Sequence, residues 1–222
     1  MESNSLSEDP TSERTGVVYA LSSYTIWGIA PVYFVTVGFA PAFEVLAHRI
    51  VWSVPLLAIF VWVGAQWQKL PFRSILSLLG CSILLSVNWL TFIYGIHQGK
   101  IAETSLGYFI NPFLSVLLAV VLLGEKMSRP QWLATIIAAF GVVLELVSVG
   151  YFPWIALSLA VSFALYSVIR RQLQVPAALG LAIETMALVP IALAYLIVSD
   201  SLSSRPFNET LLLAVGGLVT VV

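Results

Sequence analysis

The chain has 222 residues, of which 59% are hydrophobic and only 9% are charged, with 10 basic and 11 acidic side chains. A soluble domain carries roughly 25% charged residues, and one of this length has no core large enough to bury so much apolar surface. The composition excludes a disordered chain, the absence of a basic stripe excludes a nucleic-acid binder, and the single cysteine excludes a disulfide-stapled secreted domain. A polytopic membrane protein remains.

Long apolar runs follow one another along the chain, as over 104–123 and 155–169. Transmembrane strands are only about 9–11 residues long and alternate apolar with polar residues. Backbone groups in hydrocarbon must be satisfied within their own segment, so runs of this kind form helices. We therefore predict an all-α, polytopic transmembrane bundle of about seven full spans. They cover 17–37, 43–63, 73–95, 104–123, 130–149, 153–170 and 177–198, and a partial eighth begins near 210.

Residues 1–16 are polar and carry four acidic side chains against one basic side chain. They contain no basic n-region and no small-residue cleavage site, so no cleavable signal peptide is predicted. We expect a short disordered tail on the cytoplasmic side.

The break between the fourth and fifth predicted spans has the clearest boundary signals. Gly124 can end one helix in the left-handed conformation. Ser128 can cap the next helix, with Pro130 in its first turn and Gln131 completing a capping box. The breaks at 38–42, 66–71 and 99–103 are similarly short, so successive helices should be antiparallel neighbours.

The orientation follows from the distribution of Lys and Arg. With a cytoplasmic N-terminus, the outer loops hold only Lys100 and Arg205, and Arg49 lies inside a span. The other seven basic residues all fall on the cytoplasmic side: Arg14, Lys69, Arg73, Lys126, Arg129, Arg170 and Arg171. This asymmetry obeys the positive-inside rule and predicts a cytoplasmic N-terminus.

Ionisable groups inside spans are rare and are functional candidates by default. Glu44 and His48 share a helix face near the outer end of the second span, as a hydrated rim pair or as part of a pathway. Arg49 lies about 9 Å below that end and either snorkels outward or finds a partner inside the bundle. Glu145, about 6 Å below the same face, has a suitable depth for that partner.

Glu184 enters the seventh span from the cytoplasmic side, to a depth of about 10 Å. Its own helix offers no cation, and desolvation of a carboxylate favours its protonated form. Two interpretations stand for this residue: a proton carrier, or a hydrated structural hydrogen-bonding group near the interface.

Two polar sites lie at mid-membrane. Pro112 follows Asn111 in the fourth span and frees the carbonyl of Tyr108, and loosened helices of this kind build binding sites in transporters. Asn88 lies in the middle of the third span, where its amide needs a partner across helices or a wet cavity. Trp27, like Tyr108, either lines a cavity for an organic solute or packs in the core.

A weak internal repeat relates the two ends of the chain. Arg49 lies six residues before Pro55 in the second span, and Glu184 lies six residues before Pro190 in the seventh. An offset of five spans is odd, so the two copies would have opposite orientations. Inverted repeats of this kind are typical of secondary transporters, whose sites lie at the repeat interface.

Between Gly16 and about Leu196 the sequence resembles the RarD branch of the EamA-type drug/metabolite transporter superfamily. The resemblance depends on ordered stretches at 24–34, 44–53, 88–90, 105–112, 124–125, 131–132, 153–154 and 164–166. It implies a ten-helix bundle of two inverted five-helix repeats in a bacterial inner membrane, acting as a permease or exporter whose substrate is generally unassigned. The branch is named for an association with chloramphenicol sensitivity.

On this resemblance, residues 1–16 form the tail, 17–149 the first five-helix repeat and 150–222 an incomplete second repeat. About two and a half helices of the family's ten would lie beyond Val222, which would leave transport by this chain alone in doubt.

We therefore predict a secondary transporter of a small organic solute, working by alternating access with proton coupling as an open option, with the lipid bilayer and the solute as its partners. The expected pathway residues are Arg49, Glu184, Glu145, Glu44, His48, Asn88, Tyr108, Asn111 and Pro112. No cofactor or metal is expected, since two His and one Cys do not readily assemble a metal site, and no phosphate-binding loop indicates an ATP-driven pump. The alternatives are a structural or partner-binding membrane protein and a membrane-embedded enzyme, and a homo-oligomer is left open.

Overall fold

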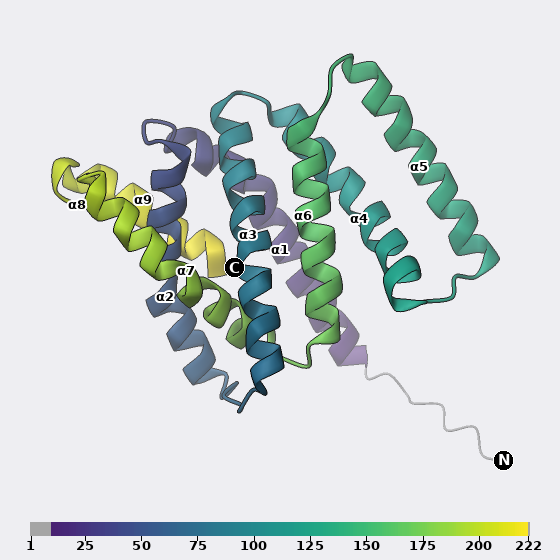
Figure 1. Ribbon diagram of the computed structural model, residues 1–222, viewed down its shortest axis with the longest axis horizontal. Coiled ribbons are helices and arrows are strands. Elements are labelled where there is room, and N and C mark those ends of the chain that lie inside the picture. Colours follow the sequence, from purple (N-terminus) through teal and green to yellow (C-terminus); the bar gives the residue numbers. More distant parts are fainter. Residues whose placement is uncertain (1–9, 222) are drawn as a thin grey trace.

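The computed structural model describes residues 10–221, and every long element in this part of the chain is an α-helix (Figure 1). The helices are α1 (Pro10–Thr36), α2 (Ala42–Val63), α3 (Phe72–His97), α4 (Ile101–Leu123), α5 (Arg129–Val149), α6 (Trp154–Gln172), α7 (Ala177–Val198), the short α8 (Ser201–Ser204) and α9 (Phe207–Val221). The all-α prediction is confirmed.

The predicted spans agree with the observed helices, with two differences. Six helices are long and apolar enough to cross a membrane: α1 from Val17, α2, α3, α4, α6 and α7. Helix α5 forms as predicted but is not among these six, and α9 is a shorter apolar helix. Helix α1 begins at Pro10 rather than near 17, so residues 10–16 extend it by about two polar turns. Residues 1–9 of the expected tail lie outside the described part.

The signals at the fourth break are confirmed. Gly124 ends α4 in the left-handed conformation, with φ of 67°. The backbone N–H of Ser128 donates to Oε1 of Gln131 at 2.8 Å, as part of a capping box that starts α5. At the third break, α4 starts at Ile101, so Glu103 lies in the first turn of that helix rather than in a loop.

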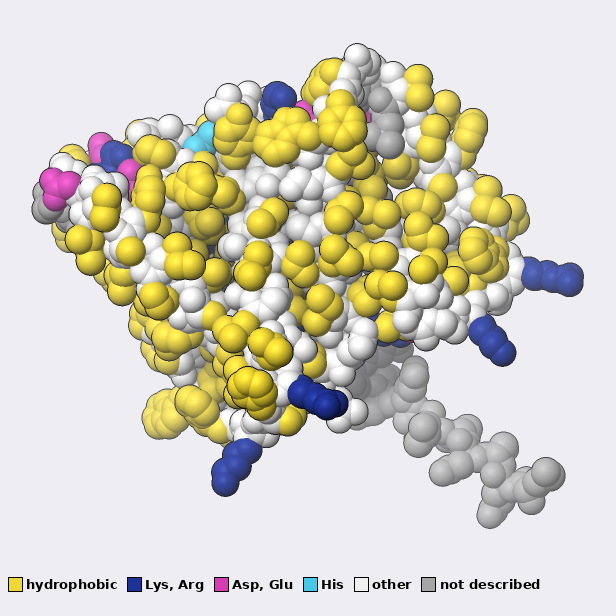
Figure 2. Space-filling model, in the orientation of Figure 1, with side chains coloured by type: hydrophobic (Ala, Val, Ile, Leu, Met, Phe, Trp, Pro, Cys, Tyr) yellow, Lys and Arg dark blue, Asp and Glu magenta, His cyan; other side chains and the backbone are white. Residues whose placement is uncertain are grey.

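The core lies where α2 and α3 pack against α6, α7 and α9. Helix α4 packs along α6, and α5 lies at the edge of the bundle beside α4 (Figure 1). Hydrophobic side chains cover most of the face seen in Figure 2, and most of the visible Lys and Arg side chains project at its lower edge. An apolar outer surface between polar ends is what a lipid-embedded bundle requires.

The contact between α4 and α6 depends on small residues. Ala156 and Ala160 of α6 are fully buried against Leu106 of α4. A Cβ at Gly107 would lie 2.8 Å from Cβ of Leu159 and 3.0 Å from the carbonyl oxygen of Ala156. Glycine at 107 therefore sets the close approach of these two helices.

Candidate functional site

Arg49 is the largest side chain that is completely buried. It extends from α2, and its Nε donates to Oγ1 of Thr220 on α9 at 2.7 Å. The Thr220 hydroxyl in turn donates to the carbonyl oxygen of Gly216 at 3.0 Å. A hydroxyl that is itself fixed by the backbone thus orients the guanidinium.

Aromatic rings surround the rest of this guanidinium. Its central carbon lies 4.3 Å from the ring centroid of Trp89, 5.6 Å from that of Phe34 and 5.8 Å from that of Trp27. Its terminal nitrogens, Nη1 and Nη2, are buried without a hydrogen-bond partner among the described residues. Cation–π contacts in a desolvated site contribute about 2 kcal/mol, which is less than the several kcal/mol that desolvating the charge costs.

Two glycines bring α9 close enough for this contact. A Cβ at Gly217 would lie 2.5 Å from the carbonyl carbon of Trp52, and a Cβ at Gly216 would lie 2.8 Å from the Tyr33 hydroxyl. That hydroxyl donates to the carbonyl oxygen of Leu212 at 3.1 Å. The α2–α9 contact therefore holds Thr220 within reach of the arginine.

Glu184 on α7 is also completely buried, and its partners come from α6. Nε of Arg170 lies 3.4 Å from its Oε1, and the Tyr166 hydroxyl donates to its Oε2 at 3.1 Å. A Cβ at Gly180 would lie 2.3 Å from Nη1 of Arg170, so glycine makes room for the cation. Arg170, which was expected at the cytoplasmic end of α6, is thus directed back into the bundle.

Glu44 and His48 are buried near the start of α2, and they are not a hydrated pair. Arg205, in the segment before α9, binds both carboxylate oxygens of Glu44, with Nη2 at 2.9 Å from Oε2. Its Nη1 donates to Glu209 at 2.9 Å, and these carboxylates raise the pKa of Arg205. His48 instead accepts a hydrogen bond from the indole Nε1 of Trp52 at 3.3 Å.

The expected pairing of Arg49 with Glu145 is wrong. Glu145 is exposed on α5, where it lines a groove of about 510 Å³ between α4 and α5. No ion pair joins it to Arg49 in the part of the chain that the structure describes. The two residues share a depth, but α5 packs outside α4 while α2 lies in the core.

The residues expected at mid-membrane differ in burial: Asn88 is buried between helices, whereas Asn111 and Pro112 are partly or fully exposed. Nδ2 of Asn88 donates to the carbonyl oxygen of Leu159 at 3.0 Å and to Oγ of Ser162 at 3.1 Å, so this amide joins α3 to α6. Asn111 is half-buried and accepts a hydrogen bond from Ser115 within α4. Pro112 lies inside α4 on an exposed position. Tyr108 stacks edge-to-face on Phe92, with centroids 5.8 Å apart.

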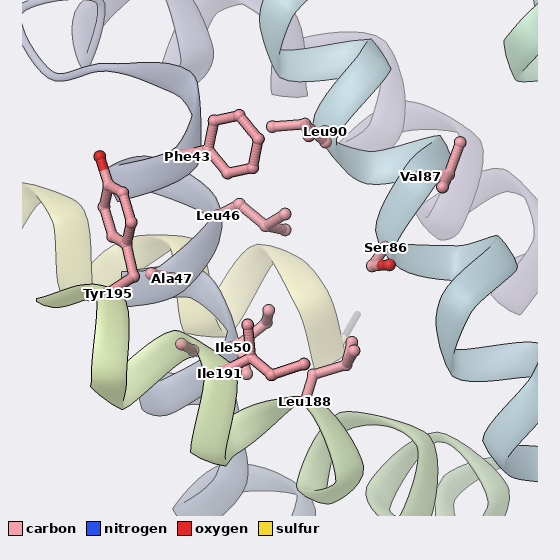
Figure 3. A pocket seen from close by; sticks show the side chains of 11 residues that line it. Phe43, Leu46, Ala47, Ile50, Ser86, Val87, Leu90, Leu188, Ile191 and Tyr195 are labelled. Carbon is pink, nitrogen blue, oxygen red and sulfur yellow. The ribbon is translucent and has the colours of Figure 1, made fainter.

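An apolar cavity of about 290 Å³ lies between α2, α3 and α7 (Figure 3). Its lining is aliphatic and aromatic, with Ser86 and the Tyr195 hydroxyl as its polar side-chain groups. Ile50 and Leu90, which line it, directly follow Arg49 and Trp89 in the chain. On both α2 and α3, a residue that lines the cavity is thus the chain neighbour of a residue of the Arg49 site.

Comparison with known proteins assigns the chain to a family. The EamA-like transporter family matches residues 14–147. The chain belongs to this family. It is 41% identical to Protein RarD of Escherichia coli (strain K12) over 96% of this chain and 76% of that protein. It is 40% identical to an uncharacterized transporter of Vibrio cholerae over 97% of this chain and 74% of that protein.

A third relative of the EamA chain is the uncharacterized transporter YojE of Bacillus subtilis, 41% identical over 84% of this chain and 65% of that protein. No solved structure matches. The family and two of these three relatives are named as transporters, and the bacterial relatives support a location in a bacterial inner membrane.

Sequence reasoning missed one buried acid in this EamA chain, Glu103. It accepts hydrogen bonds from the backbone N–H of Ile155 and from the Tyr151 hydroxyl, both at 3.0 Å. The carboxylate of α4 thus caps the first turn of α6. The hydrogen bond to Glu103 raises the pKa of Tyr151. The available signal was Pro153 at the start of an apolar run, which marks a helix N-terminus without a capping side chain of its own.

Proposed function

We propose that the protein is a secondary transporter that moves a small organic solute across the membrane by alternating access. The observation that carries this proposal is a pair of completely buried, oppositely charged side chains, Arg49 on α2 and Glu184 on α7, on helices that pack against each other. A charge at membrane depth costs about 3 kcal/mol or more. A bundle keeps such charges where they handle a solute or an ion.

The two residues occupy equivalent positions in their helices. Each lies six residues before a proline inside the helix and about 10 Å from the helix start. In the predicted topology α2 and α7 start at opposite membrane faces. We therefore take residues 17–149 and 150–222 as two inverted repeats, with the solute site where they meet.

One ion pair near the start of α2 supports a closure between the two proposed repeats. Arg205 binds Glu44 across the two proposed repeats near the start of α2. Arg170 binds Glu184 near the end of α6. Rocking of one repeat against the other would break the Arg205–Glu44 pair, whereas the Arg170–Glu184 pair lies within the second proposed repeat and would move with it.

Glu184 is our candidate for coupling to protons. Its carboxylate is buried at depth in the bundle, and among the described residues its Oε1 has an ion pair with Arg170 but no hydrogen-bond partner. Neutralisation by a proton would release Arg170 and weaken the side-chain link between α6 and α7. A glutamine at 184 keeps the shape and removes the titration.

The test is solute flux in proteoliposomes, across a library of small organic solutes, with and without a pH gradient. The wild-type protein should move at least one solute class, and Glu184→Gln should abolish the response to the gradient. Glu125→Gln is the matched control, since that carboxylate is exposed and paired with Arg171. Flux that keeps its full pH response in Glu184→Gln rejects proton carriage, and a folded wild-type protein that moves no solute rejects transport.

A further inference from the structure

The buried guanidinium of Arg49 has two nitrogens that could bind a ligand. Its Nε is occupied by Thr220, whereas Nη1 and Nη2 have no acceptor among the described residues. From this geometry we infer that Arg49 binds the anionic group of the solute, and that this group is carried on an aromatic or other flat apolar body. The inference deepens the proposed transport function and rests on it for its physiological meaning.

The first support is the absence of a counter-ion within the described bundle. No carboxylate there lies within 4 Å of the guanidinium. By contrast, Arg170, Arg171 and Arg205 each form an ion pair with a carboxylate. The neighbouring Tyr33 phenol already donates to the backbone of α9. Within the described residues, the site therefore carries one positive charge without a counter-ion, which favours an anion and repels a cationic solute.

The second support is the edge that the guanidinium leaves free. Thr220 fixes Nε, so the pair Nη1 and Nη2 is held in one orientation. Two parallel N–H donors on this edge match a carboxylate or a phosphonate, which accept bidentate hydrogen bonds. A single neutral carbonyl oxygen satisfies only one of the two.

The third support is the chemistry of the walls. Trp89, Phe34 and Trp27 surround the guanidinium, whose exposed fraction is 0%, so a solute reaches it only when these rings move apart during alternating access. Once an anion takes the charge, these rings offer flat apolar surface to the remainder of the solute. Polar, strongly hydrated bodies such as sugars gain little there.

The experiment measures thermal unfolding of the full chain in nanodiscs against five probes. These are phenylacetate, phenylphosphonate, phenylacetamide, phenethylammonium and inorganic phosphate. The two aromatic anions should raise the unfolding temperature by roughly 5–10 °C at about a hundred times their Kd. The amide, the ammonium ion and inorganic phosphate should shift it by no more than a tenth as much.

Two variants locate the effect. Arg49→Gln should weaken binding of the aromatic anions at least tenfold, as loss of a charged bidentate donor predicts, and Arg171→Gln, at an exposed arginine, should leave it unchanged. If Arg49→Gln does not fold, Thr220→Val, which frees Nε, should still weaken phenylacetate binding. The comparison of the five probes on the wild-type protein tests the inference independently of any variant.

The outcomes separate this inference from the proposal of transport. Equal stabilisation by phenylacetate and phenylacetamide, by inorganic phosphate alone, or by no anion at all overturns the inference, as does unchanged binding in a folded Arg49→Gln protein. If the protein binds aromatic anions through Arg49 but moves no solute, the inference stands and only the transport proposal is rejected.

Discussion

Replacement of Glu103 tests how the first helices are tied to α6. This carboxylate is 4% exposed, and it accepts the backbone N–H of Ile155 at 3.0 Å. Glu103→Ala removes a charge-assisted hydrogen bond and leaves that buried N–H without an acceptor. These two losses together correspond to about 2–4 kcal/mol of unfolding free energy.

The assay is thermal unfolding in nanodiscs. A loss of that size should lower the unfolding temperature by roughly 5–10 °C in a chain of this length. Glu103→Gln keeps an oxygen acceptor for Ile155 and should lose about half as much. Glu125→Gln serves as control, because its carboxylate lies at the exposed end of α4 and forms only a surface ion pair.

The same site has a distinct dependence on pH through Tyr151. The hydrogen bond to Glu103 raises the pKa of this phenol above its ordinary value of about 10. A raised folded-state pKa gives stability that is complete below the ordinary value and is lost as pH rises through the folded value. Wild type should therefore be more stable than Tyr151→Phe near neutral pH, and the difference should shrink above pH of about 10.

Two results would refute this account of Glu103. One is a Glu103→Ala protein whose unfolding temperature matches that of Glu125→Gln. The other is a difference between wild type and Tyr151→Phe that grows with pH instead of shrinking. The first would mean that the carboxylate is not the N-terminal cap of α6, and the second that it does not accept the Tyr151 hydrogen bond.

Further predictions concern helix contacts and the buried ion pair. Gly217→Ala should destabilise the protein by more than about 2 kcal/mol, because its Cβ would lie 2.5 Å from backbone of α2, whereas Gly141→Ala, with nothing within 4 Å, should be neutral or slightly stabilising. Thermal unfolding of the two variants compares them, and equal effects would contradict the close α2–α9 packing. Arg170→Gln should cost about 3–5 kcal/mol by leaving Glu184 unpaired, whereas Arg171→Gln, 63% exposed, should cost less than about 1 kcal/mol. A double-mutant cycle with Glu184→Gln should give strong coupling for position 170 alone, and equal coupling at 171 would reject the assignment.

The sequence predicted most of the helices because the membrane makes their signals local. Apolar length sets each span, and backbone satisfaction in lipid requires a helix. The start of α5 was equally local, since Gly124 and Ser128 act on neighbouring backbone groups. Where a polar segment precedes a span, as over 10–16, hydropathy marks where the apolar part begins and not where the helix begins.

Side-chain partners were predicted poorly, because they depend on which helix faces lie together. The helical rise gives the depth of Arg49 and Glu145 along the membrane normal. It gives no information on lateral position, and α5 lies at the edge of the bundle. For the same reason Glu184 was expected without a cation, although Arg170 reaches it from the preceding helix.

The two buried charges differ in how the protein compensates them. Arg49 and Glu184 hold equivalent positions in α2 and α7. Among the described residues, the carboxylate is paired with a cation, whereas the guanidinium contacts a hydroxyl and ring faces but no carboxylate. A purely structural role would favour pairing both charges, since an unpaired buried charge costs more than a paired one. Among the described residues, Glu184 has a counter-ion and Arg49 does not, so the unpaired charge and the free N–H donors lie at Arg49. The anionic solute inferred above would supply the negative charge that balances it.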